Sequence, residues 1–420
     1  MKEVIIIGAG VCGLAIARKL LEAGHRVTIL EARDRTGGRI HTITEKFTRP
    51  TETGAEFIHG RQPLTMQLLK EAGGSAIKRT GKHYRLANNE LHEGDVMEEQ
   101  WSTFFSKLSQ LKHDVTLETF LEQYFGGDGF EELRRSVRQF AEGFDIADTR
   151  RASAIALSEE WSHTDDEDQH HVKGGYRILI DYLENKISEL RGVIRLSSPV
   201  QKVVWATGRV TVITSGRTFI ADSIMVTVPL GVLQHQHIHF EPQMPAHQKA
   251  IDSMGYGGVI KFMFEFKEKF WETSPRRLLN TSFIFSDAEI PTWWTQNPEA
   301  CALITGWLGG PPAAATAHDE TSLFNKAIRS LAYITQCSPS EIRSLLKHYY
   351  IANWVTDPYS LGAYSYPTLE TSTAVKFMSA PIDKTIYFAG EAFYEGTSGG
   401  TVEAALASAE KAATKFLDSL

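Results

Sequence analysis

The segment at residues 3–30 constrains the fold more than any other part of the sequence, because it combines two buried strands, a helix and a glycine-rich turn. Residues 3–7 are apolar and β-branched, as in a buried parallel strand, and lead into glycines. Residues 11–23 carry apolar side chains at helical spacing, Gly24 ends that helix, and residues 26–30 form a second strand. The sequence therefore predicts a βαβ unit that begins a Rossmann-like α/β domain.

The turn between the first strand and the helix has the spacing GxGxxG, formed by Gly8, Gly10 and Gly13. The first glycine permits the turn, the second lets the backbone approach a pyrophosphate, and the third lets helix and strand pack closely. The helix N-terminus offers free N–H groups and a positive dipole end to the phosphates. Glu31 ends the second strand, where a carboxylate can accept both ribose hydroxyls of an adenosine. These residues predict a dinucleotide site.

A glycine loop that contains arginine follows the second strand and narrows the choice of dinucleotide. Ala32 and Arg33 come directly after the strand, and Gly38 and Arg39 form a loop that can lie against a pyrophosphate and neutralise it. The segment ILEARDRTGGRI resembles the second half of the flavin-binding signature shared by amine oxidases, amino-acid oxidases and carotenoid desaturases. A nicotinamide dehydrogenase does not need this loop, so the resemblance implies FAD.

The C-terminal segment contains a second strand–glycine–helix unit. YFAGEAF and the following GGTVEAALASAEKAA resemble the closing FAD motif of the flavin amine oxidases. The resemblance implies that Glu391, after Gly390, accepts ribityl hydroxyls. It also implies that the last helix begins at the pyrimidine edge of the isoalloxazine, where its dipole stabilises the anionic reduced flavin. The further positions that it assigns to the FAD site are Gly400, Thr401, Val402, Val200 and Pro229.

The two strand–glycine–helix units at opposite ends of the chain predict one discontinuous domain, into which a second domain is inserted. Between them, residues 96–144 and 320–350 show helical periodicity, and residues 193–228 and 255–270 read as strands. We therefore expect an α/β, Rossmann-like FAD-binding domain with an inserted α+β substrate domain of antiparallel sheet plus helices. The expected FAD-binding domain comprises residues 1–60, 168–236 and 380–420, and the expected substrate-binding domain comprises residues 61–167 and 237–379.

Composition argues against several classes of partner. Lys and Arg number 44 against 51 Asp and Glu, and no basic block is present, so nucleic acid and anionic membranes are not expected partners. No run approaches the roughly 18 apolar residues of a membrane span. The three cysteines lack metal-ligand spacing, and the acidic run at 165–168 is typical of a solvated loop, so no metal is expected. A strand that begins at residue 3 leaves no room for a signal peptide and favours a cytoplasmic location.

Lys261 helps to separate the branches of the resembled family. It lies in GGVIKFMFEF, where Phe262, Phe264 and Phe266 share one face of a strand and Lys261 lies on the other. An exposed lysine on an amphipathic strand is the alternative. The match to the amine oxidases implies instead a lysine that holds a water against flavin N5, where an ammonium would also favour uptake of hydride as negative charge.

The segment WVTDPYSLGAYSYP resembles a stretch of the polyamine oxidases and of the flavin-dependent histone lysine demethylases. The resemblance places Trp354 and Tyr364 on the wall of the cavity in front of the flavin, with an ordinary core aromatic as the alternative for Tyr364. Thr401 stands where monoamine oxidases have a second tyrosine, which argues against a monoamine-type cage. Ala363 takes the position of their covalent flavin cysteine, so FAD is expected to bind without a covalent link.

The segment GAEFIHG at residues 54–60 supplies the last candidates. Its first four residues, Gly54, Ala55, Glu56 and Phe57, match a segment that lines the flavin. His59 matches the histidine of the WIHG motif of animal-type polyamine oxidases, and we expect it to orient the amine and not to carry a proton. A structural histidine is the alternative. Glu56 is expected to pair with a distal ammonium of the substrate.

Together these resemblances imply an FAD-dependent amine oxidase, with a polyamine as the favoured substrate. Hydride would pass to flavin N5, the imine would hydrolyse, and O2 would reoxidise the flavin to give H2O2. The residues expected to act on or contact the amine are Lys261, Tyr364, His59, Glu56, Trp354 and Thr401. An FAD-dependent desaturase or protoporphyrinogen-type oxidase with a hydrophobic substrate and a non-catalytic flavin-binding module stay open as alternatives. The sequence predicts neither the oligomeric state nor the bond that is cut.

Overall fold

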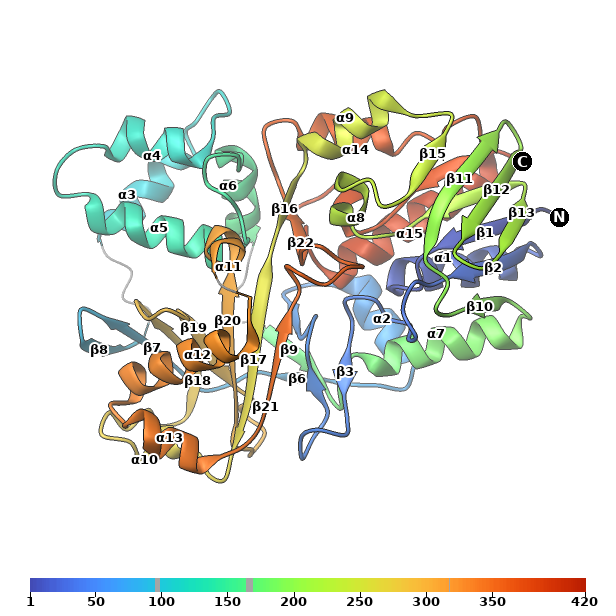
Figure 1. Ribbon diagram of the computed structural model, residues 1–420. Helices are drawn as coiled ribbons and strands as arrows, with labels where there is room; N and C mark the ends of the chain where they lie inside the picture. The colour runs from blue at the N-terminus through green and yellow to red at the C-terminus, as the bar shows by residue number, and fades with distance from the viewer. Residues whose placement is uncertain (95–98, 164–168, 317) are drawn as a thin grey trace.

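The computed structural model describes residues 1–94, 99–163, 169–316 and 318–420. Segments from both ends of the chain meet in one five-stranded parallel sheet, on the right of Figure 1. Its strands are mostly aliphatic because both faces are covered. In spatial order they are β10 (Val193–Arg195), β2 (Arg26–Leu30), β1 (Glu3–Ile7), β14 (Ser223–Val226) and β23 (Ile386–Phe388).

The two faces of this sheet bury different layers. Val4 and Ile6 of β1 pack into a helical layer, whereas Ile5 and Ile7 pack on the opposite side, as the period-two alternation of a strand requires. The helical layer consists of α1 (Val11–Glu22), α2 (Pro63–Glu71), α7 (Arg177–Glu189) and α15 (Val402–Asp418). The opposite layer consists of β13 (Thr218–Ala221), β12 (Arg209–Thr214), β11 (Val200–Ala206) and β15 (His239–Glu241), with α8 (Leu230–Gln234), α9 (Pro245–Ser253) and α14 (Thr371–Met378).

A second large sheet has seven strands and is antiparallel except for one parallel pair, β18 with β7. Phe262, Phe264 and Phe266 of its strand β17 pack in one core with the helix α12. In order the strands are β21 (Leu346–Asn353), β17 (Val259–Phe266), β20 (Leu303–Gly309), β19 (Thr292–Thr295), β18 (Thr281–Ser286), β7 (Lys82–Ala87) and β8 (Glu90–Glu93). The helices beside it are α10 (Phe270–Thr273), α11 (Gly310–Ala315), α12 (Glu320–Thr335) and α13 (Pro339–Leu345).

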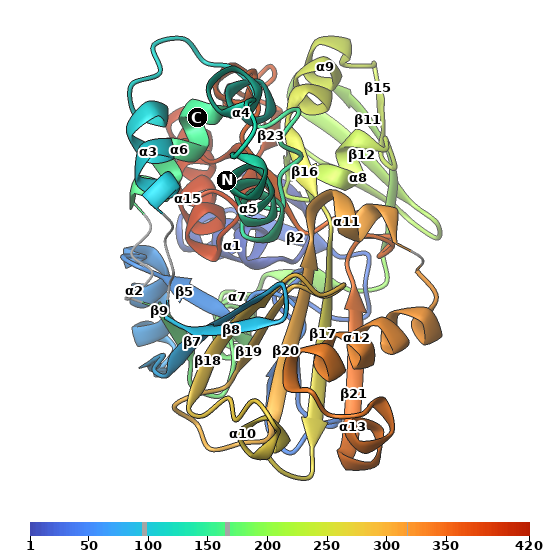
Figure 2. The same cartoon turned by 90° about the vertical axis from the view of Figure 1, so that its left-hand side faces the viewer.

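A helical lobe with its own aromatic core lies on the upper left of Figure 1. Phe104, Phe120 and Phe125 are almost fully buried in this core. Figure 2 shows the lobe above the strands of the second sheet, so segments far apart in the sequence form one part of the molecule with helices and a sheet. The helices of the lobe are α3 (Glu99–Leu108), α4 (Leu117–Phe125), α5 (Glu131–Gly143) and α6 (Ala154–His163).

Short elements connect these bodies. The strand β5 (Phe57–His59) pairs with β9, so the GAEFIHG segment is hydrogen-bonded to residues that follow the helical lobe in the sequence. The other short elements are β3 (Thr42–Ile43), β4 (Thr51–Glu52), β6 (Ala76–Lys78), β9 (Gln169–Val172), β16 (Gly255–Gly257), β22 (Tyr364–Tyr366) and η1 (Glu391–Phe393).

One prediction of secondary structure is wrong in part. Residues 320–350 were expected to be helical throughout, but α13 ends at Leu345 and the strand β21 begins at Leu346. Tyr349 and Ile351 of this strand pack against the core of the seven-stranded sheet, because aromatic and β-branched side chains fit a half-buried pleated surface.

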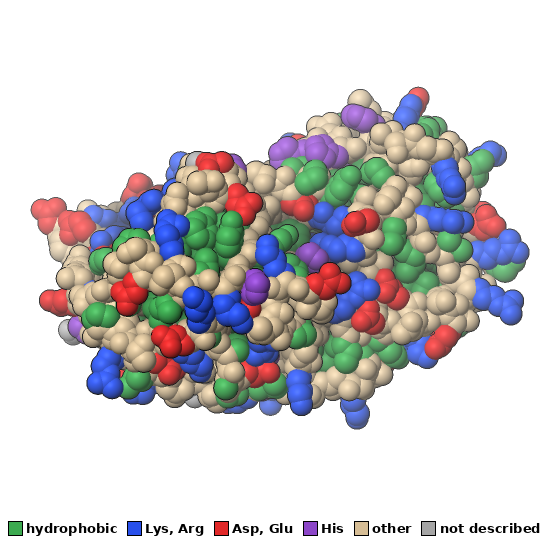
Figure 3. Space-filling view, turned by 60° about the horizontal axis from the view of Figure 1, so that its bottom comes forward, with side chains coloured by type: hydrophobic (Ala, Val, Ile, Leu, Met, Phe, Trp, Pro, Cys, Tyr) green, Lys and Arg blue, Asp and Glu red, His purple; other side chains and the backbone are tan. Residues whose placement is uncertain are grey.

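The surface agrees with a chain of mixed charge. Figure 3 shows acidic and basic side chains interspersed over the face in view, without a continuous field of either sign. Among the helices that the structure describes, none has the length and apolar character needed to cross a membrane.

Candidate active site

A cavity of about 1250 Å³ is lined by residues of the five-stranded sheet, the seven-stranded sheet and the helical lobe. Every residue that the sequence assigns to cofactor or substrate lines this cavity, except Gly13. Gly13 lies behind the lining, where a Cβ atom would come within 2.1 Å of the Gly8 oxygen. Its role is therefore the close packing of α1 on β1, as expected for the third glycine of the motif.

The end of the cavity at α1 fits a dinucleotide. A Cβ atom on Gly10 would meet nothing within 4 Å, so the backbone there is open to an approaching group. Gly10 is also the N-cap of α1 and makes no side-chain capping bond, which leaves the helix N-terminus available to a phosphate. Glu31 is buried and accepts hydrogen bonds from the backbone N–H groups of Ala9 and Arg33, at 2.7 and 2.9 Å. These bonds fix its carboxylate at the end of β2.

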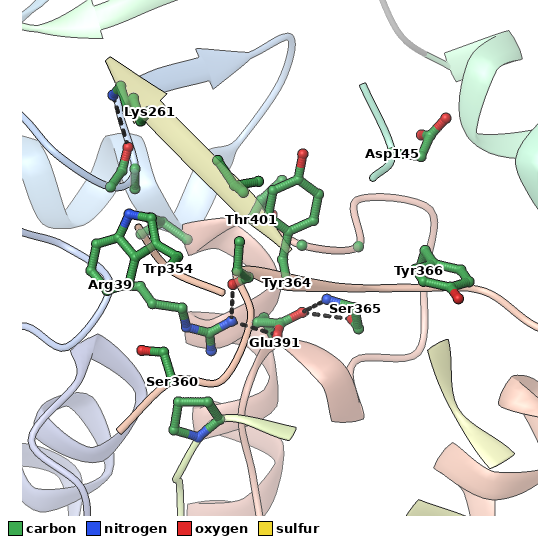
Figure 4. Close-up of a pocket in the computed structure, with 18 of the residues that line it drawn as sticks. Arg39, Asp145, Lys261, Trp354, Ser360, Tyr364, Ser365, Tyr366, Glu391 and Thr401 are labelled. Carbon is green, nitrogen blue, oxygen red and sulfur yellow. Dashed lines mark hydrogen bonds and ion pairs between the residues drawn. The ribbon is translucent and has the colours of Figure 1, made fainter. Parts of the chain in front are cut away.

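Two arginines of the flavin-like signature are held by carboxylates from the C-terminal half of the chain. Arg33 forms a bidentate ion pair with Asp357, at 3.0 and 2.6 Å. Arg39 donates to Glu391 Oε1 at 2.7 Å, and the other oxygen of Glu391 accepts from the Ser365 hydroxyl at 2.6 Å (Figure 4). Residues from the N-terminal and C-terminal parts of the chain thus form one polar strip, which consists of Arg33, Arg39, Asp357 and Glu391. This polar strip fits the polar ribityl and pyrophosphate parts of a flavin dinucleotide.

The turn into α15 lies against the aromatic residues of the WVTDPYSLGAYSYP segment. Gly400 has φ +69°, and a Cβ atom on it would come within 2.7 Å of the Tyr364 ring. Thr401 is the N-cap of α15 and accepts from the N–H of Ala404 at 3.1 Å. Trp354 donates from Nε1 to the Thr53 oxygen at 2.8 Å, beside Gly54. The remaining lining positions of this region and of the adenosine end are Ala55, Phe57, Val200, Pro229, Gly390 and Val402.

Lys261 is almost fully buried on β17, where its strand neighbour on β20 is Trp307. Its ammonium donates to Glu56 Oε2 at 2.6 Å and to the Gly54 oxygen at 3.1 Å. The exposed lysine considered as an alternative is therefore not present. Glu56, which was expected to meet an ammonium of the substrate, pairs with Lys261 in this structure.

An aromatic wall leads from this ion pair to the helical lobe. The rings of Trp294 and Trp307 have centroids 5.9 Å apart, and Trp307 lies 6.5 Å from the ring of Tyr364, with 29° between their planes. Tyr364 donates its hydroxyl hydrogen to the Phe144 oxygen at 2.7 Å. Trp307 occupies space beside Tyr364 although Thr401 replaces the second tyrosine of the monoamine oxidases. Sequence reasoning missed Trp307, because no motif marks it and no strand was expected at residues 303–309.

The ring of His59 lies beside two aromatic rings and has few polar contacts. Its ring lies 5.7 Å from Phe57 and 5.8 Å from Phe144. Among the described residues, Nδ1 of His59 has no hydrogen-bond partner. Burial, helped by the charge of Arg79, lowers the pKa of His59 to about 4. The imidazole is therefore neutral at neutral pH and is suited to orienting a ligand by hydrogen bonding.

Two acidic residues of the helical lobe also line the cavity, and sequence reasoning missed both. Asp145 follows α5, is 5% exposed, and accepts from Trp161 Nε1 at 2.9 Å through Oδ2. Its Oδ1 has no hydrogen-bond partner in the part of the chain that the structure describes. Burial raises the pKa of Asp145 to about 7, and burial together with the charge of Asp145 raises the pKa of Glu160 well above its ordinary range. No motif marks these two residues, and both lie outside the segment 96–144 that was expected to be helical.

The expectation of no metal concerns the His, Cys, Asp and Glu side chains. Within residues 1–94, 99–163, 169–316 and 318–420, no group of three or more His, Cys, Asp or Glu side chains could hold a metal ion. The acidic run at 165–168, weighed above as a solvated loop, lies outside the described residues.

The chain matches the family model described as flavin containing amine oxidoreductase over residues 11–417. It therefore belongs to this family of flavin-dependent enzymes, and the family and enzyme class predicted from the sequence are confirmed.

Curated relatives cover nearly the whole chain at modest identity. Polyamine oxidase 4 of Oryza sativa subsp. japonica is 27% identical over 99% of this chain and 89% of its own length. Lysine-specific histone demethylase 1B of Mus musculus is 26% identical over 93% of this chain. This chain spans only 50% of that demethylase.

Solved structures support the fold. A wild-type putrescine oxidase bound to putrescine superposes with a TM-score of 0.82 at 20% identity, and covers 99% of each chain. Cyclohexylamine oxidase from Brevibacterium oxydans superposes with a TM-score of 0.82 at 19% identity, over 100% of this chain and 99% of its own. The predicted α/β fold class with a Rossmann-like cofactor part and a substrate part of sheet and helices is confirmed.

Proposed function

We propose that the protein is an FAD-dependent amine oxidase whose preferred substrate carries at least two cationic nitrogens, as a polyamine or diamine does. The observation that carries this proposal is Asp145. Its Oδ1 is buried without a partner among the described residues, in the same cavity as Lys261 and Tyr364. A buried carboxylate oxygen without a donor is costly unless a ligand supplies one. The distal ammonium of a diamine is a donor that fits.

FAD would be held without a covalent bond by the polar strip and the α1 turn. Glu31 would accept from the adenosine ribose, the N-terminus of α1 would face the pyrophosphate, and Glu391 would meet the ribityl chain. Ala363 has no nucleophile with which to form a covalent link. When bound, FAD would supply the redox chemistry, a two-electron oxidation of the C–N bond of the amine with O2 as the final electron acceptor and H2O2 as the reduced product.

The chain's own residues would prepare the amine for this reaction. A cationic amine has no lone pair to drive C–H cleavage, and an alkylamine with a pKa near 10.4 loses its proton at pH 7.5 at a cost of about 4 kcal/mol. The aromatic wall of Trp307 and Tyr364 favours the neutral form of the reacting nitrogen by excluding water. His59 would orient this nitrogen as a hydrogen-bonding partner. Trp354 and Thr401 would bound the space in front of the flavin.

The division of the chain and its cellular setting form part of the proposal. Residues 1–60, 168–236 and 380–420 would bind FAD, and residues 61–167 and 237–379 would shape the substrate space. The partners would be a small amine and O2, not nucleic acid or a membrane, and the location would be cytoplasmic. The mixed surface charge and the net charge of −7 support this choice of partners.

The test is the visible spectrum of the purified holoprotein under argon, before and after addition of single amines. The panel contains spermine, spermidine, N-acetylated polyamines, putrescine, benzylamine and leucine. We expect the flavin band to bleach with polyamines or diamines and to return on admission of air, with one H2O2 formed per amine oxidised. A yellow protein that no amine bleaches would contradict the proposal and favour a desaturase-like enzyme or a non-catalytic flavin-binding module.

A further inference from the structure

A buried carboxylate with an unusual number of donors lies beside Lys261. Glu56 accepts a hydrogen bond from Lys261 Nζ at 2.6 Å, from Trp294 Nε1 at 3.0 Å and from Gln296 Nε2 at 2.9 Å. The side chains of Glu56 and Lys261 are 7% and 1% exposed. The ammonium of Lys261 also lies 5.6 Å from the centre of the Trp294 ring. The carboxylate thus accepts three hydrogen bonds from two separate parts of the chain, β17 and residues 294–296.

The surroundings of Glu56 explain why its carboxyl stays ionised. Burial alone would raise the pKa of Glu56, but the charge of Lys261 and the three donors lower it below its ordinary value. A charge of either sign is costly in such a place unless an opposite charge and hydrogen bonds accompany it. The pair is therefore neutral as a unit, while its ammonium end stays fixed at the cavity.

Other titratable groups face the pair from neighbouring elements. Glu52 on β4 interacts electrostatically with both Lys261 and Glu56, and burial raises its pKa to about 7. Arg79, which follows β6, and His171 on β9 also interact electrostatically with Glu56. Neither Arg79 nor His171 bonds directly to Glu56 among the contacts that the structure describes. Glu56 is the carboxylate in direct contact with the lysine.

We propose that Glu56 is a positioning residue that keeps Lys261 protonated and fixed at the flavin-facing wall of the cavity, and so sustains the reaction of the reduced flavin with O2. The proposal rests on the role of Lys261 in the proposed function. In that reaction two electrons and the N5 proton leave the anionic reduced flavin, one proton comes from solvent, and O2 becomes H2O2. A fixed positive charge near this step stabilises the negative charge that develops on oxygen.

The physical consequence appears when the carboxylate is removed. In Glu56→Gln the ammonium of Lys261 would remain buried without a counter-ion, and a buried ammonium in that state loses its proton more easily. The variant would then carry one positive charge at low pH and none at high pH, whereas the native pair has no net charge at either. A pH-dependent step in addition to any that the titration of Glu52 gives the native protein is therefore the signature of the proposed role.

The experiment uses holoprotein reduced by light under argon, so that it needs no amine. The native protein, Glu56→Gln, Lys261→Met, the double variant and the control Glu265→Gln are mixed with air-saturated buffer from pH 6 to pH 9. Glu265 is a matched control, because it is a buried glutamate on the same strand as Lys261, pairs with Lys347 and lies away from the cavity lining. The flavin midpoint potential is measured over the same pH range by equilibration with dyes.

We expect reoxidation of Glu56→Gln to be at least about tenfold slower at pH 9 than at pH 6, relative to the native protein. Its flavin potential should exceed the native value at pH 6 and return toward it at pH 9. The double variant should lose this pH dependence, and Glu265→Gln should match the native protein. Reoxidation of Glu56→Gln that matches the native protein, or that is slowed equally at every pH, would overturn the proposal.

A folding readout keeps the proposal testable if Glu56→Gln is unstable. In that case the proposal requires the Glu56→Gln/Lys261→Met apoprotein to fold, because the unpaired buried ammonium is gone; a double variant that also fails to fold would overturn it. The proposed function fails in a different way. If no amine bleaches the native holoprotein, the amine oxidase proposal is refuted, while the light-reduced flavin still reports on Glu56 and Lys261.

Discussion

Asp145→Asn tests whether the helical lobe recognises a second cation. Asn keeps the size of the side chain, and its oxygen can still accept the hydrogen bond from Trp161 Nε1 that Asp145 accepts at 2.9 Å. The substitution therefore removes the negative charge and leaves the packing of the lobe in place. We expect the variant to lose its preference for diamines over monoamines and to keep its flavin.

The magnitude follows from the burial of Asp145, which is 5% exposed. Two unit charges 4 Å apart attract by about 4 kcal/mol at an effective dielectric constant of 20. The cost of desolvating the two charges cancels part of this attraction. Hydrogen bonds to charged groups contribute about 1.5–3 kcal/mol net. We expect kcat/KM for putrescine to fall about 10- to 150-fold, while the value for butylamine changes by less than about threefold.

The assay follows oxygen consumption with putrescine and with butylamine from pH 6 to pH 8.5. Because burial raises the pKa of Asp145 to about 7, its carboxyl is mostly protonated at pH 6 and mostly ionised at pH 8. The native ratio of kcat/KM for diamine over monoamine should rise across this range, and the ratio of the variant should stay flat. Asp148→Asn is the control, since Asp148 pairs with Arg150 away from the cavity lining. Equal losses on both substrates in Asp145→Asn would refute the reasoning.

Three further predictions follow from the same cavity. Lys261→Met should retain FAD but slow flavin reduction or reoxidation in stopped-flow experiments; unchanged rates in both half-reactions would contradict its assignment. His59→Ala should raise the KM for amine more than it lowers kcat, because the neutral imidazole orients the substrate; a loss confined to kcat would make His59 catalytic. Burial raises the pKa of Glu52 from 4.5 to about 7. The folded apoprotein therefore binds an extra proton between these values, and its unfolding free energy should fall by up to about 3 kcal/mol as pH rises from 4.5 to 7. Denaturant unfolding of Glu52→Gln should lack this slope, and an identical slope in both proteins would rule out Glu52 as its source.

The cofactor side of the molecule could be predicted from sequence because its requirements are local. Gly8 and Gly13 are separated by one turn of chain, and the 2.1 Å approach that excludes a side chain at Gly13 is made to the oxygen of Gly8. Glu31 accepts hydrogen bonds from the turn between β1 and α1, at Ala9, and from Arg33 just after β2. Such spacings are set by the geometry of a strand, a turn and a helix, so the residue types alone indicate them.

The substrate side could not be predicted in the same way, because its contacts join residues that only the tertiary structure brings together. Glu56 meets Lys261 across 205 positions and Trp294 across 238, and Tyr364 reaches Phe144 across 220. The sequence marked Glu56 as an acid beside the flavin segment, which is compatible with either a substrate cation or a protein cation as its partner. The partner depends on the register of β17, which aims Lys261 at Glu56. In the cavity lining, Oδ1 of Asp145 has no hydrogen-bond partner among the residues that the structure describes. In our proposal the second ammonium of the substrate is therefore recognised by Asp145, which belongs to no motif, and not by Glu56, which the GAEFIHG motif indicates.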